Sequence, residues 1–148
     1  MAYYSLGVGG LGPAAAYLPA DIISPALPLG VPWAPAGALS LDLFGPGTDD
    51  IDALILQDLG IPGVFDPADF VAFSLTPASA TLGAFGAGYA PGGGDLLVPD
   101  GPDPGPFPDI FMPAAAFGLA PGDNLDAIEV APNPNRKWVL NPGKGSFP

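Results

Sequence analysis

The sequence predicts an all-β protein of two tandem repeats of about 70 residues, with four short strands each and Gly/Pro-rich loops. The arrangement expected for such units is propeller-like or sandwich-like. Glycine and proline each occur 22 times in 148 residues. Proline interrupts helices and glycine supplies the positive φ angles of turns, so long helices are not expected. Hydrophobic residues still make up 49% of the chain, which is enough for a packed core.

Two landmarks recur in one register and define the repeat. Residues 47–55 resemble residues 122–129, and aligning the aspartates that they share gives an offset of 126 − 52 = 74. Residues 21–25 resemble residues 95–99 at the same offset, since 95 − 21 = 74. The sequence therefore predicts an internal duplication.

The predicted domain organisation follows from this register. We expect a single β domain over residues 1–130, made of two circularly offset repeats, 3–56 and 70–130, and a proline-rich basic tail over residues 131–148. Hydrophobic alternation and short apolar runs bounded by Gly and Pro indicate strands. In chain order, these are Tyr3–Leu6, Asp21–Ser24, Ala38–Phe44, Ile51–Leu56, Phe70–Leu75, Asp95–Val98, Phe111–Leu119 (alanine-rich, with a helical turn as the alternative) and Leu125–Val130.

The predicted strand order begins part-way through a repeat, so the first strand of the chain lacks the strand that would precede it in a complete repeat. This suggests that the two ends of the chain pair with each other. Tyr3–Leu6 is expected to pair beside Leu125–Val130, either within one molecule as a closed ring or between molecules as a head-to-tail polymer. The basic residues all lie in the tail and would complement the acidic body of a neighbour. The alternative is that the tail folds back onto its own acidic loops. The residues predicted to take part in assembly are Tyr3, Tyr4, Ser5, Leu6, Arg136, Lys137, Trp138 and Lys144.

Composition also excludes several classes of function. The net charge is −12 with only three Lys and Arg residues, so nucleic acid is not an expected partner. Without cysteine or histidine, the chain has no disulfides, thiolate nucleophiles or soft-metal ligands. The charge-free run 70–94 is broken by Pro77 and Pro91, so no membrane span is expected. Residues 1–5 lack the basic start of a secretory signal.

The acidic loops are the candidate metal site. Each places three oxygen-bearing side chains within four positions, and calcium is the cation that prefers such hard ligands. The predicted ligands are Asp49, Asp50 and Asp52 in one loop and Asp123, Asn124 and Asp126 in the other. The alternative is that Asp49 or Asp123 caps a turn while the others face solvent. No Asp-Thr-Gly or Asp-Ser-Gly element is present and no histidine can serve as a base, so we predict that the chain is not an enzyme.

Residues 73–79 (Phe-Ser-Leu-Thr-Pro-Ala-Ser) and residues 117–128 (Phe-Gly-Leu-Ala-Pro-Gly-Asp-Asn-Leu-Asp-Ala-Ile) carry a resemblance. They are similar to repeats of uncharacterised secreted bacterial β-repeat proteins, in which a Leu-Gly-Leu, Pro, Asp-Asn-Leu-Asp-Ala-Leu segment alternates with Phe-Ser-Leu segments. The resemblance covers most of residues 40–130. It implies an extracellular or cell-surface protein of propeller-like or solenoid β-units, and brings no activity with it.

These observations predict a structural subunit that assembles with itself into an extracellular filament or surface layer, joined through its terminal strands and tail. The alternative is a calcium-dependent carbohydrate-binding or adhesion module. In that alternative, aromatic rings such as Tyr17, Tyr89 or Trp33 would stack on a glycan.

Overall fold

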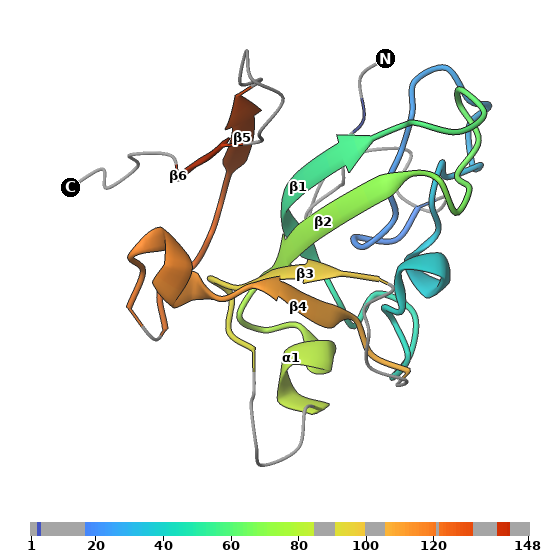
Figure 1. The fold of residues 1–148 in the computed structure, drawn as a ribbon. Helices are drawn as coiled ribbons and strands as arrows, with labels where there is room; N and C mark the ends of the chain where they lie inside the picture. The colour runs from blue at the N-terminus through green and yellow to red at the C-terminus, as the bar shows by residue number, and fades with distance from the viewer. Residues whose placement is uncertain are drawn as a thin grey trace.

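A computed structural model describes residues 3, 17–84, 91–99, 106–120, 122–131 and 139–142. These residues are mostly β with almost no helix (Figure 1), which confirms the predicted β character. The elements, in order, are the 3-10 helix η1 (Ala36–Leu39), β1 (Ile51–Gln57), β2 (Phe70–Leu75), α1 (Ala80–Ala84), β3 (Leu96–Val98), β4 (Asp109–Met112), the 3-10 helix η2 (Ala114–Phe117), β5 (Ile128–Ala131) and β6 (Val139–Pro142).

One antiparallel sheet with the strand order β1-β2-β3-β4 forms the centre of the described structure. Each strand therefore pairs with the next strand along the chain, as in a meander. Phe73 on β2 sits at its middle, opposite Leu54 on β1 and Leu97 on β3. The strands β5 and β6 form a separate two-stranded antiparallel sheet.

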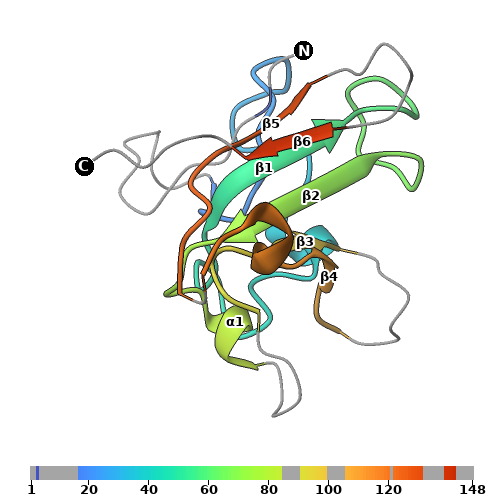
Figure 2. The same cartoon turned by 60° about the vertical axis from the view of Figure 1, so that its left-hand side comes forward.

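Both faces of the central sheet carry hydrophobic side chains. We call the face with Val71, Phe73 and Leu97 the first face, and residues 20–41 cover it. The opposite, second face carries Ala72 and Leu96, and residues between 117 and 128 pack against it. Figures 1 and 2 show the N-terminal segments (blue) and the β5–β6 sheet (red) on opposite sides of the central sheet.

The core on the first face is the larger of the two. Phe73 is completely buried there, and Trp33 packs across it with an edge contact to Phe65 at 5.1 Å between ring centroids. Burying a large aromatic side chain contributes roughly 1.5–3 kcal/mol to folding. The buried residues of this core are Ala20, Ile22, Trp33, Ala34, Ala36, Leu39, Leu41, Ile51, Val71, Phe73, Leu75, Leu82 and Leu97.

Two aspartates organise the turns that lead into the 3-10 helices. The Asp21 carboxylate accepts the N–H groups of Leu18 at 2.8 Å and of Ala36, the first residue of η1, at 2.9 Å. The Asp95 carboxylate accepts equivalent N–H groups three residues upstream and at the first residue of η2, from Gly92 at 2.7 Å and Ala114 at 2.6 Å. Because both aspartates are buried, these bonds replace the water that the carboxylates lose.

The surroundings of the two aspartates also match. Ile22, next to Asp21, forms an antiparallel bridge with Ala34, and Leu96, next to Asp95, pairs with Met112. Each 3-10 helix then starts after a proline and ends at a residue with left-handed backbone, Ser40 with φ 60° for η1 and Gly118 with φ 76° for η2.

The predicted strand Ala38–Phe44 is wrong. Its alternating leucines, Leu39 and Leu41, are indeed buried, but η1 and a tight turn occupy the segment. Ser40 and Asp42 adopt left-handed φ values of 60° and 57°, which a strand does not allow. The turn is held by the Asp42 carboxylate, which accepts N–H groups from Gly47 and Asp49 at 2.9 Å each.

Other predicted elements are shorter or differently bounded than expected. Residues 21–24 contribute an isolated bridge at Ile22 rather than a full strand. The alternative for residues 111–119, a helical turn, is confirmed by η2. The tail holds a strand, β6, that the sequence analysis did not predict.

Helix is scarce in the described part of the chain. The α-helix there, α1, has five residues. Among the described residues, no helix has the length and apolar character needed to cross a bilayer.

The Asp95 bonds lead to a first prediction. Replacing Asp95 with alanine leaves the N–H groups of Gly92 and Ala114 without their acceptor, and we expect unfolding to become easier by about 1–3 kcal/mol. Asp95→Asn keeps one acceptor oxygen and should cost less. Urea denaturation measures the change, with the exposed Asp126→Asn as a matched control within about 0.5 kcal/mol of wild type. Equal stability of Asp95→Ala and wild type would contradict the structural role of this carboxylate.

Candidate functional site

Asp49 of the first acidic loop is enclosed by donors from the chain itself. It is 1% exposed, and its carboxylate accepts the N–H of Asp42 at 2.7 Å, the N–H of Thr81 at 2.8 Å and the Thr81 hydroxyl at 2.7 Å. These three bonds tie the turn before β1 to helix α1. Asp49 therefore organises a turn, which was the alternative to a role as a calcium ligand. Both of its carboxylate oxygens already accept hydrogen bonds from the protein.

Three of the other predicted ligands, Asp52, Asn124 and Asp126, come together from the two acidic loops, whereas Asp50 and Asp123 make separate contacts. The Asn124 side-chain amide donates to Asp52 Oδ2 and to Asp126 Oδ1, each at 2.5 Å. Asp50 is buried and its N–H donates to the Ser79 hydroxyl at 3.0 Å. Asp123 is exposed and accepts one N–H, from Ala120, at 2.7 Å.

Leu125 fixes the position of this group against the central sheet. Its carbonyl accepts the Ser74 hydroxyl at 2.8 Å, and its N–H donates to the Gly93 carbonyl at 3.1 Å. The side chain of Leu125 is buried on the second face. These contacts bring Asn124 beside Asp52, 72 positions earlier in the chain.

The predicted calcium site is thereby narrowed to Asp52, Asn124 and Asp126. Within the ranges that the structure describes, no three Asp, Glu, His or Cys side chains are grouped as metal ligands. Two carboxylates and one amide oxygen are nevertheless hard donors of the kind that calcium uses. Turning the Asn124 amide would replace its NH₂ by its oxygen between the two carboxylates.

Of the residues predicted to take part in assembly, the structure describes Tyr3. Its hydroxyl donates to Asp58 Oδ2 at 2.5 Å, and its ring lies 4.8 Å from that of Trp33. Burial, and then the bond to the Asp58 carboxylate, raise the pKa of Tyr3 to about 12. The remaining predicted assembly residues (Tyr4, Ser5, Leu6, Arg136, Lys137, Trp138 and Lys144) lie outside the described part of the chain.

Trp33 does not offer its ring to a glycan, because it is only 4% exposed. Tyr17 is half-buried, and its hydroxyl accepts the N–H of Gly30 at 2.9 Å. Tyr89, the third predicted stacking residue, lies outside the described residues. Of the three aromatic residues named for stacking on a glycan, Trp33 is therefore too buried to do so.

A third acidic loop, residues 58–69, joins β1 to β2. Asp66 accepts N–H groups from Ile61 and Ala68, both at 2.8 Å. Asp69 accepts N–H groups from Leu59 at 2.8 Å, Gly60 at 3.1 Å and Asp66 at 2.8 Å. Burial acts to raise the pKa of Asp69, but the three backbone donors outweigh it, so the pKa lies below the ordinary 3.8.

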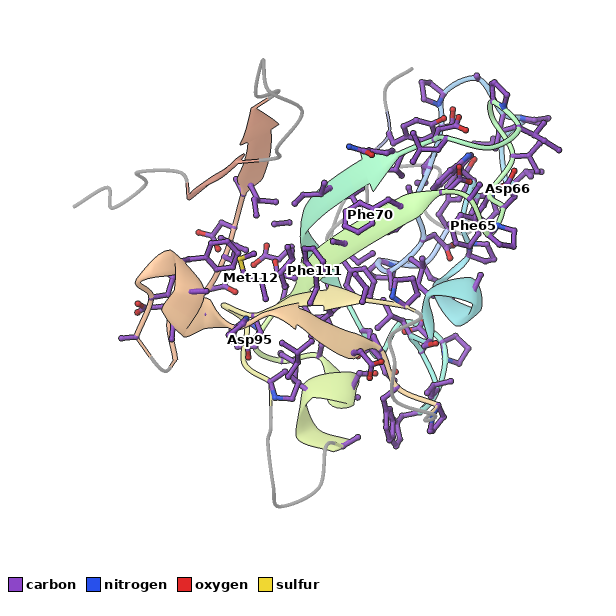
Figure 3. The ribbon with its side chains drawn as sticks, in the orientation of Figure 1. Phe65, Asp66, Phe70, Asp95, Phe111 and Met112 are labelled. Atoms are coloured by element: carbon purple, nitrogen blue, oxygen red, sulfur yellow. The ribbon has the colours of Figure 1, made fainter. Side chains whose placement is uncertain are left out.

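The second face of the sheet carries a group of partly exposed hydrophobic side chains. Phe111 on β4 is 48% exposed and makes an edge contact with Phe70 at 5.5 Å between ring centroids. Figure 3 shows Phe70, Phe111 and Met112 together on this side of the sheet. The half-buried hydrophobic residues around them are Val98, Phe117, Leu119 and Ile128. We call Phe70, Val98, Phe111, Met112, Phe117 and Leu119 the apolar patch.

Comparison with protein-family models, with curated proteins and with solved structures finds no match to this chain. The resemblance to secreted bacterial β-repeat proteins therefore stays a prediction. Function has to be argued from the chain's own contacts: the carboxylates that accept backbone N–H groups and the apolar patch.

The narrowed cation site gives a second prediction. We expect Ca²⁺ to bind at Asp52, Asn124 and Asp126 with a Kd on the order of 10⁻⁴–10⁻³ M, the range of exposed extracellular sites. Isothermal titration calorimetry of wild type and of the double variant Asp52→Asn/Asp126→Asn measures this binding. Heat that persists in the double variant but disappears in Asp49→Asn would place the cation at Asp49 instead.

The lowered pKa of Asp69 gives a third prediction. A depressed folded-state pKa means that the charged carboxylate stabilises the fold above about pH 4 and that this stabilisation is lost as the pH falls through the folded-state value. The stability difference between wild type and Asp69→Asn should therefore shrink from pH 5 to pH 2. Chemical denaturation at a series of pH values measures it; a difference that stays constant with pH would show that Asp69 contributes nothing through its charge.

Proposed function

We propose that this protein is a non-catalytic structural subunit of an extracellular filament or surface layer, built from two copies of one β-unit and assembling with itself. The observation that carries the proposal is the unequal burial of matching positions in the two copies. In the first repeat (residues 3–56), the apolar side chains around Trp33 are buried against the first face of the central sheet. In the second repeat (residues 70–130), the matching side chains around Phe111 are partly exposed.

The two copies can be aligned through the local structure on each side. The bridge Ile22–Ala34 corresponds to the pair Leu96–Met112, and η1 corresponds to η2. Between these landmarks the offset changes from 96 − 22 = 74 to 112 − 34 = 78, because the second loop is four residues longer. The same offset of 78 places Trp33 at the position of Phe111.

Burial differs sharply between matching positions. Trp33 is 4% exposed and Phe111 is 48% exposed. Ala34, Ala36, Leu39 and Leu41 are all buried, and their counterparts Met112, Ala114, Phe117 and Leu119 are all half-buried. Burial of the inner pair Ile22 and Leu96 is complete in both copies. Each repeat therefore has an apolar surface that is suited to packing against a layer of β-strands. In the described structure, the strands that pack on this surface of the second repeat are those of the β5–β6 sheet.

The use of the acids supports a structural role over catalysis. General acid–base chemistry uses a carboxyl group whose surroundings tune its pKa and which can exchange a proton with a substrate. In the described part of the chain, the buried Asp21, Asp49 and Asp95 instead accept two or three hydrogen bonds each from backbone or threonine donors.

The terminal joint, Tyr3–Leu6 beside Leu125–Val130, remains part of the proposal. β5 is paired with β6 along Ile128–Pro142 to Ala131–Val139. A strand from a neighbour therefore has to displace β6 or use the other edge of β5. Such an exchange between copies would create the head-to-tail contact.

The fourth prediction is that the purified protein self-associates. Sedimentation velocity from 1 to 200 µM protein, at 20 and 500 mM NaCl, should show mass increasing with concentration. An increase with salt would show that screening of the net charge of −12 dominates, and a decrease would show that the attraction between basic tail and acidic body dominates. Negative-stain electron microscopy of the concentrated sample should show ordered polymers. A monodisperse monomer under all these conditions, with and without Ca²⁺, would refute the proposal.

A further inference from the structure

We propose that two neighbouring loops of this protein insert their apolar tips into the surface of a lipid bilayer with zwitterionic headgroups. One loop is residues 58–69, between β1 and β2, and the other is residues 25–32, between the bridged residues Ile22 and Ala34. We call them the tip loops. The proposal does not depend on the proposed self-assembly, and it involves none of the residues of the apolar patch.

The two tip loops meet through aromatic contacts at their bases. The ring of Trp33, which directly follows the first loop, lies 5.1 Å from the ring of Phe65 in the second loop and 4.8 Å from that of Tyr3. The Tyr3 hydroxyl donates to Asp58 at the start of the second loop. Figure 3 shows Phe65 and Asp66 in this loop, at the end of the β1–β2 hairpin. The tip loops therefore lie side by side at one end of the central sheet.

The exposed residues of both tip loops are apolar, although the chain has a net charge of −12. Each of them is Pro, Ala, Gly, Val, Leu or Ile. The larger ones are far out in solvent: Leu29, Val31, Leu59, Ile61 and Val64 are 70%, 47%, 63%, 64% and 51% exposed. The tips of the two loops thus present hydrophobic side chains and no charge.

The three aspartates of the second loop are turned onto its own backbone. Asp66 and Asp69 together accept five N–H groups of the loop. Asp58 accepts a sixth, from Gly63, at 2.7 Å. The carboxylates that would otherwise keep this loop in water are therefore used to pair its backbone donors.

Most of the remaining backbone donors are also paired or absent. The N–H groups of Val64 and Asp69 donate to carbonyls within the second loop, both at 3.0 Å, and the two prolines of this loop carry no N–H. In the first loop, three of eight residues are proline, and the N–H of Gly30 donates to the Tyr17 hydroxyl at 2.9 Å.

This pairing favours a lipid surface over another protein as the partner. An N–H group that enters hydrocarbon finds no acceptor there, so a loop can enter only if its own chain pairs its donors. A protein partner brings acceptors of its own and does not require this arrangement. Protruding apolar tips on a paired backbone therefore fit the boundary between headgroups and acyl chains, where buried apolar area supplies the binding energy.

Charge determines which lipids are bound. The tip loops contain no Lys or Arg, and the chain as a whole is strongly acidic, so anionic headgroups repel it. Zwitterionic headgroups carry no net charge and do not. Binding should therefore be stronger to phosphatidylcholine vesicles than to phosphatidylglycerol vesicles. Raising NaCl from 20 to 500 mM should strengthen only the binding to phosphatidylglycerol, because salt screens the repulsion.

A label at the loop tip tests insertion directly. The chain lacks cysteine, so Ile61→Cys can carry a single polarity-sensitive fluorophore. Phosphatidylcholine vesicles should shift its emission to the blue, and spin-labelled lipid should quench it. Phe44→Cys is the matched control, because Phe44 is 55% exposed but lies outside the tip loops, and its emission should not change. A blue shift that needs no vesicles and grows with protein concentration would instead place a second copy on the loops and overturn the proposal.

The second arm of the experiment measures affinity by co-sedimentation with the same vesicles. Ile61→Asp and Leu29→Asp should each weaken binding to phosphatidylcholine at least about tenfold, while Phe44→Asp should stay within about twofold of wild type. Circular dichroism establishes that the variants are folded. The proposal fails if wild type does not bind phosphatidylcholine vesicles, or if Ile61→Asp binds them as tightly as wild type. Either failure leaves the proposed self-assembly untouched, because sedimentation velocity tests that without lipid.

Discussion

The interaction on which the described structure most depends is the hydrogen bond from a backbone N–H to an aspartate carboxylate. The chain holds fifteen acidic residues and three basic ones, all three of which are at positions 136–144, so ion pairs cannot neutralise the body. Its strands are short, and its 22 prolines remove backbone donors. Aspartates therefore organise the turns. Those that accept backbone N–H groups are Asp21, Asp42, Asp49, Asp58, Asp66, Asp69, Asp95 and Asp123.

This constraint explains the choice of Asp over Glu. The short Asp side chain reaches backbone N–H groups two to five residues away, as in Gly63 N–H to Asp58 at 2.7 Å. It also spans longer separations where the fold brings a turn alongside, as Ala36 to Asp21 and Ala114 to Asp95. The latter bonds fix each 3-10 helix to its strand pair. The helix η1 places Leu39 in the core on the first face of the sheet, and η2 places Phe117 against the core on the second face.

The β character and the positions of two strands could be predicted from the sequence, because alternation and β-branched content are local signals, whereas the predicted two-repeat, propeller-like or sandwich-like arrangement stays a prediction. The strands at residues 51–57 and 70–75 were predicted almost to their ends. Residues 38–44 were not, because the alternation of Leu39 and Leu41 looks the same for a strand and for a 3-10 helix followed by left-handed residues. The left-handed φ of Asp42 depends on its bonds to Gly47 and Asp49, which the pattern does not reveal. β6 was missed because prolines and glycines dominate its surroundings.

The candidate site was predicted less well, since its geometry depends on long-range contacts. The sequence indicated two equivalent acidic loops, yet Asp49 is buried under Thr81 while Asp52 meets Asn124. The half-exposed apolar patch could not have been found from hydrophobicity, because Trp33 and Phe111 are similar as residues and differ only in what covers them.

The bonds that the Asp21 and Asp95 carboxylates accept from backbone N–H groups are tested most directly by amide hydrogen exchange measured by NMR. If these bonds hold the turns, the N–H groups of Leu18, Ala36, Gly92 and Ala114 are all protected from exchange, although none is bonded to a backbone carbonyl within a sheet. The account would be contradicted if Gly92 and Ala114 exchanged as fast as an unstructured peptide while the amides of β1 and β2 stayed protected.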